Sequence, residues 1–244
     1  MIDVLAIDFD LEQMSARAET RGHFWIDFVG TTRTETMLEI GVWKGEFAAK
    51  MLGGCETLRR YYMIDPWAQL PDWDKPFNVE QQEFDDIFAE AMQNTAFAEE
   101  KRVVLRGRTK EVIDEIPDES LDLAYIDGDH TLRGITIDLI KLYPKVKPGG
   151  FICGDDFGSD PWQHASSFEP TLVFPFAIYF AEAMNHPLVA LPRQQFVMQK
   201  TKDRGFAFVD TVGKYANLSL SLTPSTQVAA WAKRTARSVI DKIR

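Results

Sequence analysis

Short apolar runs alternate with helical segments through the middle of this chain. The runs are at residues 36–40, 61–64, 103–105, 121–126 and 151–153. The segments between them show helical apolar spacing or end at a proline, at 46–52, 84–92, 111–116 and 132–143. Strands that alternate with helices across short turns form a parallel sheet with helices on both faces. The sequence therefore predicts an α/β fold with a doubly wound, mostly parallel sheet of about seven strands.

The 244 residues fit one domain, with a core at about 30–200 and a C-terminal extension at 201–244. A helix is expected at 11–29, before the first strand. A turn is expected at 147–150, before the fifth strand. After residue 156 the pattern predicts a helix at 174–184, strands at 188–191 and 195–199, and a last helix at 227–243. The last helix carries the basic residues of the tail, which are Lys233, Arg234, Arg237, Lys242 and Arg244. They form either a solvated face or a contact surface for a homo-oligomer or an anionic partner.

The net charge of −10 bears on the class of partner. A surface this acidic repels the phosphate backbone, so we expect a small-molecule substrate and no nucleic acid. The start of the chain shows no secretory signal, and no apolar stretch is long enough to span a membrane. Cys55 and Cys153 have no metal-type spacing. A cytoplasmic protein with reduced cysteines is expected.

The first strand runs directly into a turn that contains Glu39, Gly41, Trp43 and Gly45. Glycines in a strand-to-helix turn let backbone amides approach a ligand closely. The pattern is acidic-x-Gly-x-x-x-Gly rather than the dinucleotide G-x-G-x-x-G. It resembles motif I of class I S-adenosylmethionine-dependent methyltransferases, although a purely structural glycine turn would show the same letters.

Two further residues follow neighbouring strands of the same predicted sheet. Asp65 ends the second strand, where a carboxylate can accept both hydroxyls of a ribose. Thr109 follows the third strand, where methyltransferases place contacts to adenine. Each has a simpler interpretation, because Asp65 precedes a proline and Thr109 is suited to cap a helix. Together with the glycine turn they predict a cofactor site at the carboxyl ends of the strands.

Acidic residues follow the fourth and fifth strands. Asp127 lies in Asp-Gly-Asp-His, and Asp155 and Asp156 lie in Gly-Asp-Asp-Phe. Adjacent parallel strands would bring these carboxylates together, and their repulsion calls for a cation. Mg²⁺ prefers such oxygen ligands, and Mn²⁺ suits them as well. The alternative is that these acids cap helices or contact the cofactor alone, a role expected in any case for Asp127.

This order of motifs, with Lys-Pro-Gly-Gly between the two acidic segments, resembles the methyltransferase-24 type of class I methyltransferase. The resemblance covers roughly residues 36–157 and is more distant to catechol and macrocin O-methyltransferases. It implies a Rossmann-like fold and an S-adenosylmethionine-dependent enzyme. In metal-dependent relatives, acids at the positions of Asp127, Asp155 and Asp156 hold the cation. The catechol enzymes have a lysine base where this chain has His130.

His130 and His164 are the candidate catalytic bases, because a histidine titrates near neutrality and can take a proton from a hydroxyl. Trp67, Trp73, Phe77 and Trp162 are candidates for an apolar acceptor pocket. We therefore expect a divalent-metal-dependent O-methyltransferase for a small molecule. The alternatives are a metal-independent N- or O-methyltransferase, a nicotinamide-dependent oxidoreductase, and a non-catalytic cofactor-binding protein. The sequence leaves the acceptor and the oligomeric state open.

Overall fold

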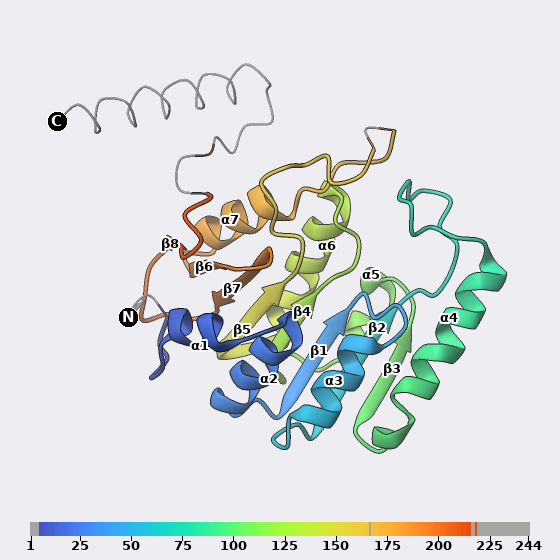
Figure 1. The fold of residues 1–244 in the computed structure, drawn as a ribbon, viewed down its shortest axis with the longest axis horizontal. Coiled ribbons are helices and arrows are strands. Elements are labelled where there is room, and N and C mark those ends of the chain that lie inside the picture. Colours follow the sequence, from blue (N-terminus) through green and yellow to red (C-terminus); the bar gives the residue numbers. More distant parts are fainter. Residues whose placement is uncertain (1–4, 166, 216–217, 219–244) are drawn as a thin grey trace.

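A computed structural model describes residues 5–165, 167–215 and 218 of the chain (Figure 1). Its centre is an eight-stranded sheet in the order β3-β2-β1-β4-β5-β7-β6-β8. The five strands from β3 to β5 are parallel, and β7 runs antiparallel to both of its neighbours. The strands are β1 (Thr36–Ile40), β2 (Arg60–Asp65), β3 (Arg102–Arg106), β4 (Leu121–Ile126), β5 (Val146–Gly154), β6 (Pro187–Leu191), β7 (Gln195–Gln199) and β8 (Ala207–Asp210). The predicted fold class is confirmed, with one strand more than expected.

Helices cover both faces of the sheet. The α-helices are α1 (Leu11–Arg17), α2 (Arg21–Thr31), α3 (Glu46–Gly54), α4 (Gln81–Asn94), α5 (Thr109–Val112), α6 (Leu132–Leu142) and α7 (Val173–Ala183), with short 3₁₀ turns at Ala96–Ala98, Ile113–Glu115 and Tyr143–Lys145. One apolar core contains side chains of α1 to α4, and a second core contains side chains of α6 and α7. The sheet is therefore the middle of three layers.

The strands separate these two cores by simple alternation. In β1, Met37 belongs to the core under α1 to α4, and Leu38 belongs to the opposite core. Both side chains are fully buried. Because successive side chains of a strand point to opposite faces, a continuous apolar run is what a strand covered on both sides requires. This is why β1 and β4 lie at the residues that their apolar runs predict.

Two local expectations are wrong. The helix expected at 11–29 is divided, because Ala18 adopts an extended conformation and the Thr20 hydroxyl caps a new helix by accepting from the His23 amide at 3.2 Å. The turn expected at 147–150 lies inside β5, where the pairing with β4 shifts register between Leu121 and Leu123. The irregularity accommodates the Pro-Gly-Gly residues without ending the strand.

The C-terminal extension begins by adding to the sheet. β8 pairs with β6 in parallel and becomes the edge strand. The expected helix at 227–243 and the basic residues of the tail lie outside the described residues. Among the described residues, no helix combines the length and the hydropathy that a membrane crossing would need.

Candidate active site

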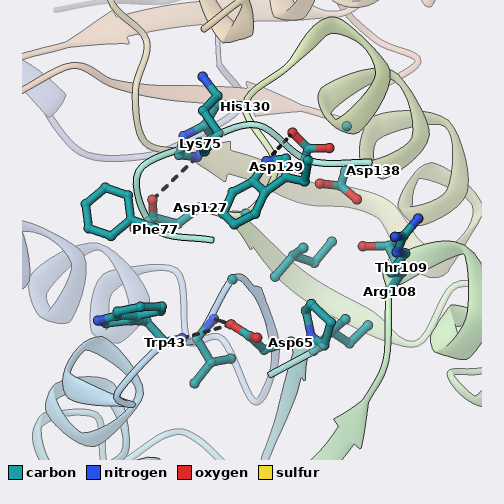
Figure 2. Close-up of a pocket in the computed structure, with 18 of the residues that line it drawn as sticks. Trp43, Asp65, Lys75, Phe77, Arg108, Thr109, Asp127, Asp129, His130 and Asp138 are labelled. Carbon is teal, nitrogen blue, oxygen red and sulfur yellow. Dashed lines mark hydrogen bonds and ion pairs between the residues drawn. The ribbon is translucent and has the colours of Figure 1, made fainter. Parts of the chain in front are cut away.

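A cavity of about 640 Å³ opens at the carboxyl ends of the central strands (Figure 2). Its walls come from the turn after β1, the end of β2, the segment after β3 and the acidic ends of β4 and β5. Ligands of open parallel sheets bind at this edge, because the strand order reverses between β1 and β4 and leaves a crevice there. Every residue expected from the sequence to bind the cofactor, hold the metal or act as the base, except Gly45, lines this cavity.

The turn after β1 is held tightly against the end of β4. Gly41 has φ +86°, and a Cβ atom placed on it would lie 2.1 Å from the backbone oxygen of Asp127. A side chain is therefore excluded at this position. Gly45 has φ +74° at the start of α3, where a Cβ would lie 3.1 Å from Ala91 of α4. The two glycines serve the close packing of the turn, and Gly41 also leaves its backbone facing the cavity.

Asp65 organises this turn through backbone amides. Its Oδ2 accepts hydrogen bonds from the amides of Val42 and Trp43, both at 2.9 Å, and its Oδ1 accepts from Trp67 at 2.8 Å. The residue is only 8% exposed, and burial raises the pKa of its carboxyl although the three amide bonds and Arg106 oppose the shift. Asp65 thus forms part of the cavity wall and fixes the loop around it.

Glu39 lies deeper in the same wall. It is 1% exposed, and its Oε2 accepts a hydrogen bond from the Tyr61 hydroxyl at 2.8 Å. Burial raises the pKa of Glu39 well above its usual range, and the charge of Asp127 adds to the shift. Trp43, with φ +51°, covers this side of the cavity and packs edge-on against Phe77 and Phe84.

Thr109 and Asp138 lie together on the β3 side of the cavity, away from Trp43 in Figure 2. Thr109 begins α5, and its side chain hydrogen bonds to the carboxyl of Asp138 on α6. Asp138 is 4% exposed, and burial raises its pKa to about 7. The helical position of Asp138 had given no reason to place it in a site.

The carboxylates of β4 and β5 meet as expected, but an arginine lies between them. Arg21 Nη1 is 3.2 Å from Asp127 Oδ2 and contacts Asp155 Oδ2 directly. The other Asp155 oxygen accepts from Gln195 Nε2 at 2.5 Å and from the Asp156 amide at 2.8 Å. The Asp155 carboxylate thus contacts Arg21 with one oxygen, and Gln195 and the Asp156 amide with the other.

Asp156 faces His130. Its Oδ2 is 2.6 Å from His130 Nδ1, while His130 Nε2 lies 3.6 Å from Asp127 Oδ1. Burial by itself lowers the pKa of His130, but the hydrogen bond and charge of Asp156 and the charge of Asp127 outweigh it and raise the pKa. His130 Nε2 is buried and has no hydrogen-bond partner. A buried polar atom without a partner in a cavity wall marks a position for a ligand.

These residues also form a group that offers metal ligands. Asp127, His130 and Asp156 each present one ligand atom, all within 4.8 Å of one another. Of the three predicted metal ligands, Asp127 and Asp156 belong to this group, whereas Asp155 contacts Arg21 and is not part of it. Asp129, from the same Asp-Gly-Asp-His segment, accepts a hydrogen bond from the Trp73 indole at 3.0 Å.

The segment at 66–80, which follows β2, supplies part of the cavity lining, including Trp73, Lys75 and Phe77. Besides the Trp73 bond, the Arg108 side chain binds the Asp72 carboxylate, and Lys75 Nζ donates to the Thr171 hydroxyl at 3.1 Å. Lys75 is 6% exposed, and burial lowers its pKa. Figure 2 shows Lys75 beside His130, so this side of the cavity also contains a lysine.

The four aromatic residues expected around an acceptor divide into two pairs. Trp73 and Phe77 line the cavity, and His164 packs edge-on against Phe77. Trp67 is instead fully buried behind the turn, where its indole donates to the Trp43 carbonyl at 2.8 Å. Trp162 is half exposed and lies outside the lining.

Comparison with known proteins agrees with this architecture. Residues 38–157 match a family model described as a methyltransferase domain. No curated protein matches the chain. An O-methyltransferase from Bacillus cereus, solved with S-adenosylhomocysteine, is similar with a TM-score of 0.53 at 17% identity, over 80% of this chain and 92% of its own.

Two further solved structures have the same fold. The O-methyltransferase NovP has a TM-score of 0.53 at 18% identity, over 79% of both chains. The O-methyltransferase TomG from Streptomyces achromogenes, solved with S-adenosylmethionine, has a TM-score of 0.52 at 13% identity, over 80% of this chain and 91% of its own. At these identities the structures establish the fold, while the family model spans the glycine turn and both acidic segments. Residues 38–157 therefore form a methyltransferase domain of the methyltransferase-24 type, on the fold of the class I S-adenosylmethionine-dependent methyltransferases.

Proposed function

We propose that this enzyme transfers a methyl group to a hydroxyl of a small molecule, with the aid of a divalent cation. One observation carries the proposal. A single cavity holds the turn fixed by Asp65 and, opposite it, the group formed by Asp127, His130 and Asp156. A methyl donor on the first side and an acceptor on the second would meet in line, and such positioning supplies much of the rate of a displacement reaction.

The cofactor half of the cavity consists of Glu39, Gly41, Trp43, Asp65 and Thr109, with Gly45 behind them. Asp65 would accept the ribose hydroxyls. Each of its oxygens already accepts from backbone amides, but a carboxylate oxygen has capacity for a further bond. Glu39 and Asp127 provide carboxyl oxygens that can accept bonds from the methionine ammonium, and Thr109 would face the adenine. The bound S-adenosylmethionine supplies an electrophilic methyl group whose departure leaves a neutral thioether.

His130 is the proposed base. Its Nδ1 bond to Asp156 holds the ring and leaves Nε2 as the acceptor for a proton. The hydroxyl proton of the substrate would pass to Nε2, while the oxygen forms the new bond to the methyl carbon. Asp156 then stabilises the imidazolium. His164, at the aromatic rim beside Phe77, is the second candidate for this role.

Asp127, Asp155 and Asp156 would hold the cation. Two observations on these residues support the fit: the carboxylates already attract the guanidinium of Arg21, and the buried His130 Nε2 beside Asp127 has no partner. When bound, Mg²⁺ or Mn²⁺ would lower the pKa of the acceptor hydroxyl and orient it.

The test is an assay of methyl transfer to a panel of small hydroxylated acceptors, with chelator-treated enzyme and with added Mg²⁺ or Mn²⁺. The proposal expects loss of turnover in chelator and recovery with either ion. Cofactor affinity, measured by calorimetry in the same samples, should change little. Full activity in excess chelator would contradict the metal part of the proposal.

A second candidate is a metal-independent O- or N-methyltransferase. Arg21 already places a positive charge against Asp127 and Asp155, and Asp156 is bonded to His130, which favours it. The two candidates differ in the chelator experiment, and they share the cofactor half of the cavity.

A further inference from the structure

Arg21 reaches the acidic cluster from a distant part of the chain. It is the first residue of α2, and its Nη1 lies against Oδ2 of both Asp127 and Asp155. Its guanidinium also lies over the Phe47 ring, 5.4 Å from the centroid. About a third of the side chain is exposed, so water reaches the contact from one side.

The positive charge of Arg21 does not stabilise the helix that carries it. Backbone amides at a helix N-terminus carry partial positive charge, so a cation in the first turn is unfavourable there. The Thr20 hydroxyl already caps the helix. Arg193 holds the preceding link by donating to the carbonyls of Ala18 and Glu19 at 2.6 and 3.1 Å. The positive charge is thus presented to the carboxylates by a fixed segment.

Asp155 is held by partners other than Arg21. Asp155 Oδ1 accepts from Gln195 Nε2 and from the Asp156 amide. Gln195 is itself fixed, because its Oε1 accepts from the Trp25 indole at 2.9 Å and from the Tyr125 hydroxyl at 2.6 Å. Gln195 is 2% exposed. The oxygen that Arg21 binds, Oδ2, therefore keeps its place when the arginine leaves.

We propose that Arg21 is an exchangeable counter-ion that competes with the divalent cation for Asp127 and Asp155. This inference rests on the proposed function, because it takes these carboxylates to be metal ligands. Arg21 neutralises them while the cation is absent and must leave them when the cation binds. Two positive charges held at the same two oxygens repel each other, so the arginine weakens metal binding and links it to the start of α2.

The test compares Mn²⁺ binding, measured by calorimetry and by electron paramagnetic resonance, in wild-type enzyme and in Arg21→Met. Loss of the competing charge should tighten Mn²⁺ binding by about tenfold, as expected for a partly exposed ion pair of ~1 kcal/mol strengthened by its second carboxylate. Arg21→Lys keeps the charge and should lie between the two. Arg17→Met removes an exposed charge at the end of α1 and should bind Mn²⁺ like wild type.

A second control separates competition from general repulsion. Lys75 is another cation of the cavity, but it donates to Thr171 and to neither Asp127 nor Asp155. Lys75→Met should therefore change Mn²⁺ affinity by about threefold or less. Hydrogen exchange gives an independent readout. Saturating Mg²⁺ should increase exchange in the first turn of α2 in wild type, and Arg21→Met should lose this response.

The outcomes are distinct. Equal Mn²⁺ affinity in wild type and Arg21→Met, or an equal gain in Lys75→Met, would overturn the competition and leave the proposed function standing. Failure of every variant to bind Mn²⁺ would overturn the metal site and this inference with it. If Arg21→Met unfolds, Arg21→Lys and the exchange of α2 in wild type decide the question.

Discussion

The two halves of the cavity are built by different means. In the cofactor half, Asp65 accepts from three backbone amides, and Gly41 is wedged against the backbone of Asp127. In the acceptor half, Arg21 and His130 contact Asp127, Asp155 and Asp156 through side chains alone. The first half is fixed by the main chain, and the second is a set of ionic contacts whose partners can exchange.

The difference has a mechanistic meaning. A cofactor of constant shape is served by a rigid turn, since a pre-formed site loses little entropy on binding. In the proposed reaction, acceptor, proton and cation would each enter and leave the second half, so its charges would need partners in every state. Substitutions in the cofactor half should consequently alter affinity, and substitutions in the acceptor half should alter turnover.

The largest effect is expected for His130→Ala. Removal of the base should lower kcat by roughly 10²–10⁴-fold while cofactor and metal affinity stay close to wild type. A fall in metal affinity would instead identify His130 as a ligand. In wild type, kcat/KM should rise with pH as His130 loses its proton, because only the neutral ring accepts a proton; in the metal-free protein Asp156 and Asp127 raise the pKa of this ring.

His164→Ala is the matched comparison. His164 lies at the rim against Phe77 and Phe168, without a carboxylate partner among the described hydrogen bonds. We expect a loss of less than about tenfold, appearing mainly in KM. A larger loss in His164→Ala than in His130→Ala would exchange the roles of the two histidines.

Asp65→Ala should weaken S-adenosylmethionine binding by about 1.5–3 kcal/mol, because it removes the ribose acceptor and releases three amides of the turn. Isothermal calorimetry measures the change directly. Asp85→Ala, which removes an exposed carboxylate on α4, is the control and should bind as wild type. Equal affinities for wild type and Asp65→Ala would mean that the ribose lies elsewhere.

Asp138→Asn should change the pH dependence of stability. Burial raises the pKa of Asp138 from 3.8 to about 7, so its protonated form is favoured in the folded state. Its stabilising contribution is complete below pH 3.8 and is lost as pH rises through about 7. Asparagine stays neutral, so the variant should gain about 2–6 °C in melting temperature over wild type between pH 4 and pH 8. Asp86→Asn on the surface of α4 should show no such widening.

The smallest effect is expected for Trp73→Phe. The substitution keeps an aromatic ring in the loop at 66–80 and removes its bond to Asp129. KM for the acceptor should rise by about two- to fivefold, as expected for the loss of a hydrogen bond of ~0.5–1 kcal/mol.

Proteolysis of the loop should slow in wild type when cofactor and acceptor bind. Equal rates with and without ligands would show that the loop does not close over them.

Local sequence patterns predicted the central strands and the edge of the sheet where the site lies. Thr36–Ile40 and Leu121–Ile126 are strands at the predicted residues, and the glycine turn and the acidic strand ends meet at one edge of the sheet. These features are local, since apolar runs, glycines and prolines act on their own neighbourhood. Parallel order then brings the strand ends together.

The contacts between charged side chains became apparent in the folded structure and had no signal in the sequence. Arg21 comes from a helix about a hundred residues before Asp127, Lys75 comes from a loop, and Asp138 from a buried helix face. None has a local pattern that differs from an ordinary surface or core position. A capping residue such as Thr20 could have predicted that the helix at 11–29 is divided. The contact between Arg21 and Asp155 that follows from this division has no such local signal. The apolar pattern of the sequence indicates which residues are buried. Ionic contacts depend on distance in space, so the pairs of charged residues are set by how the layers pack.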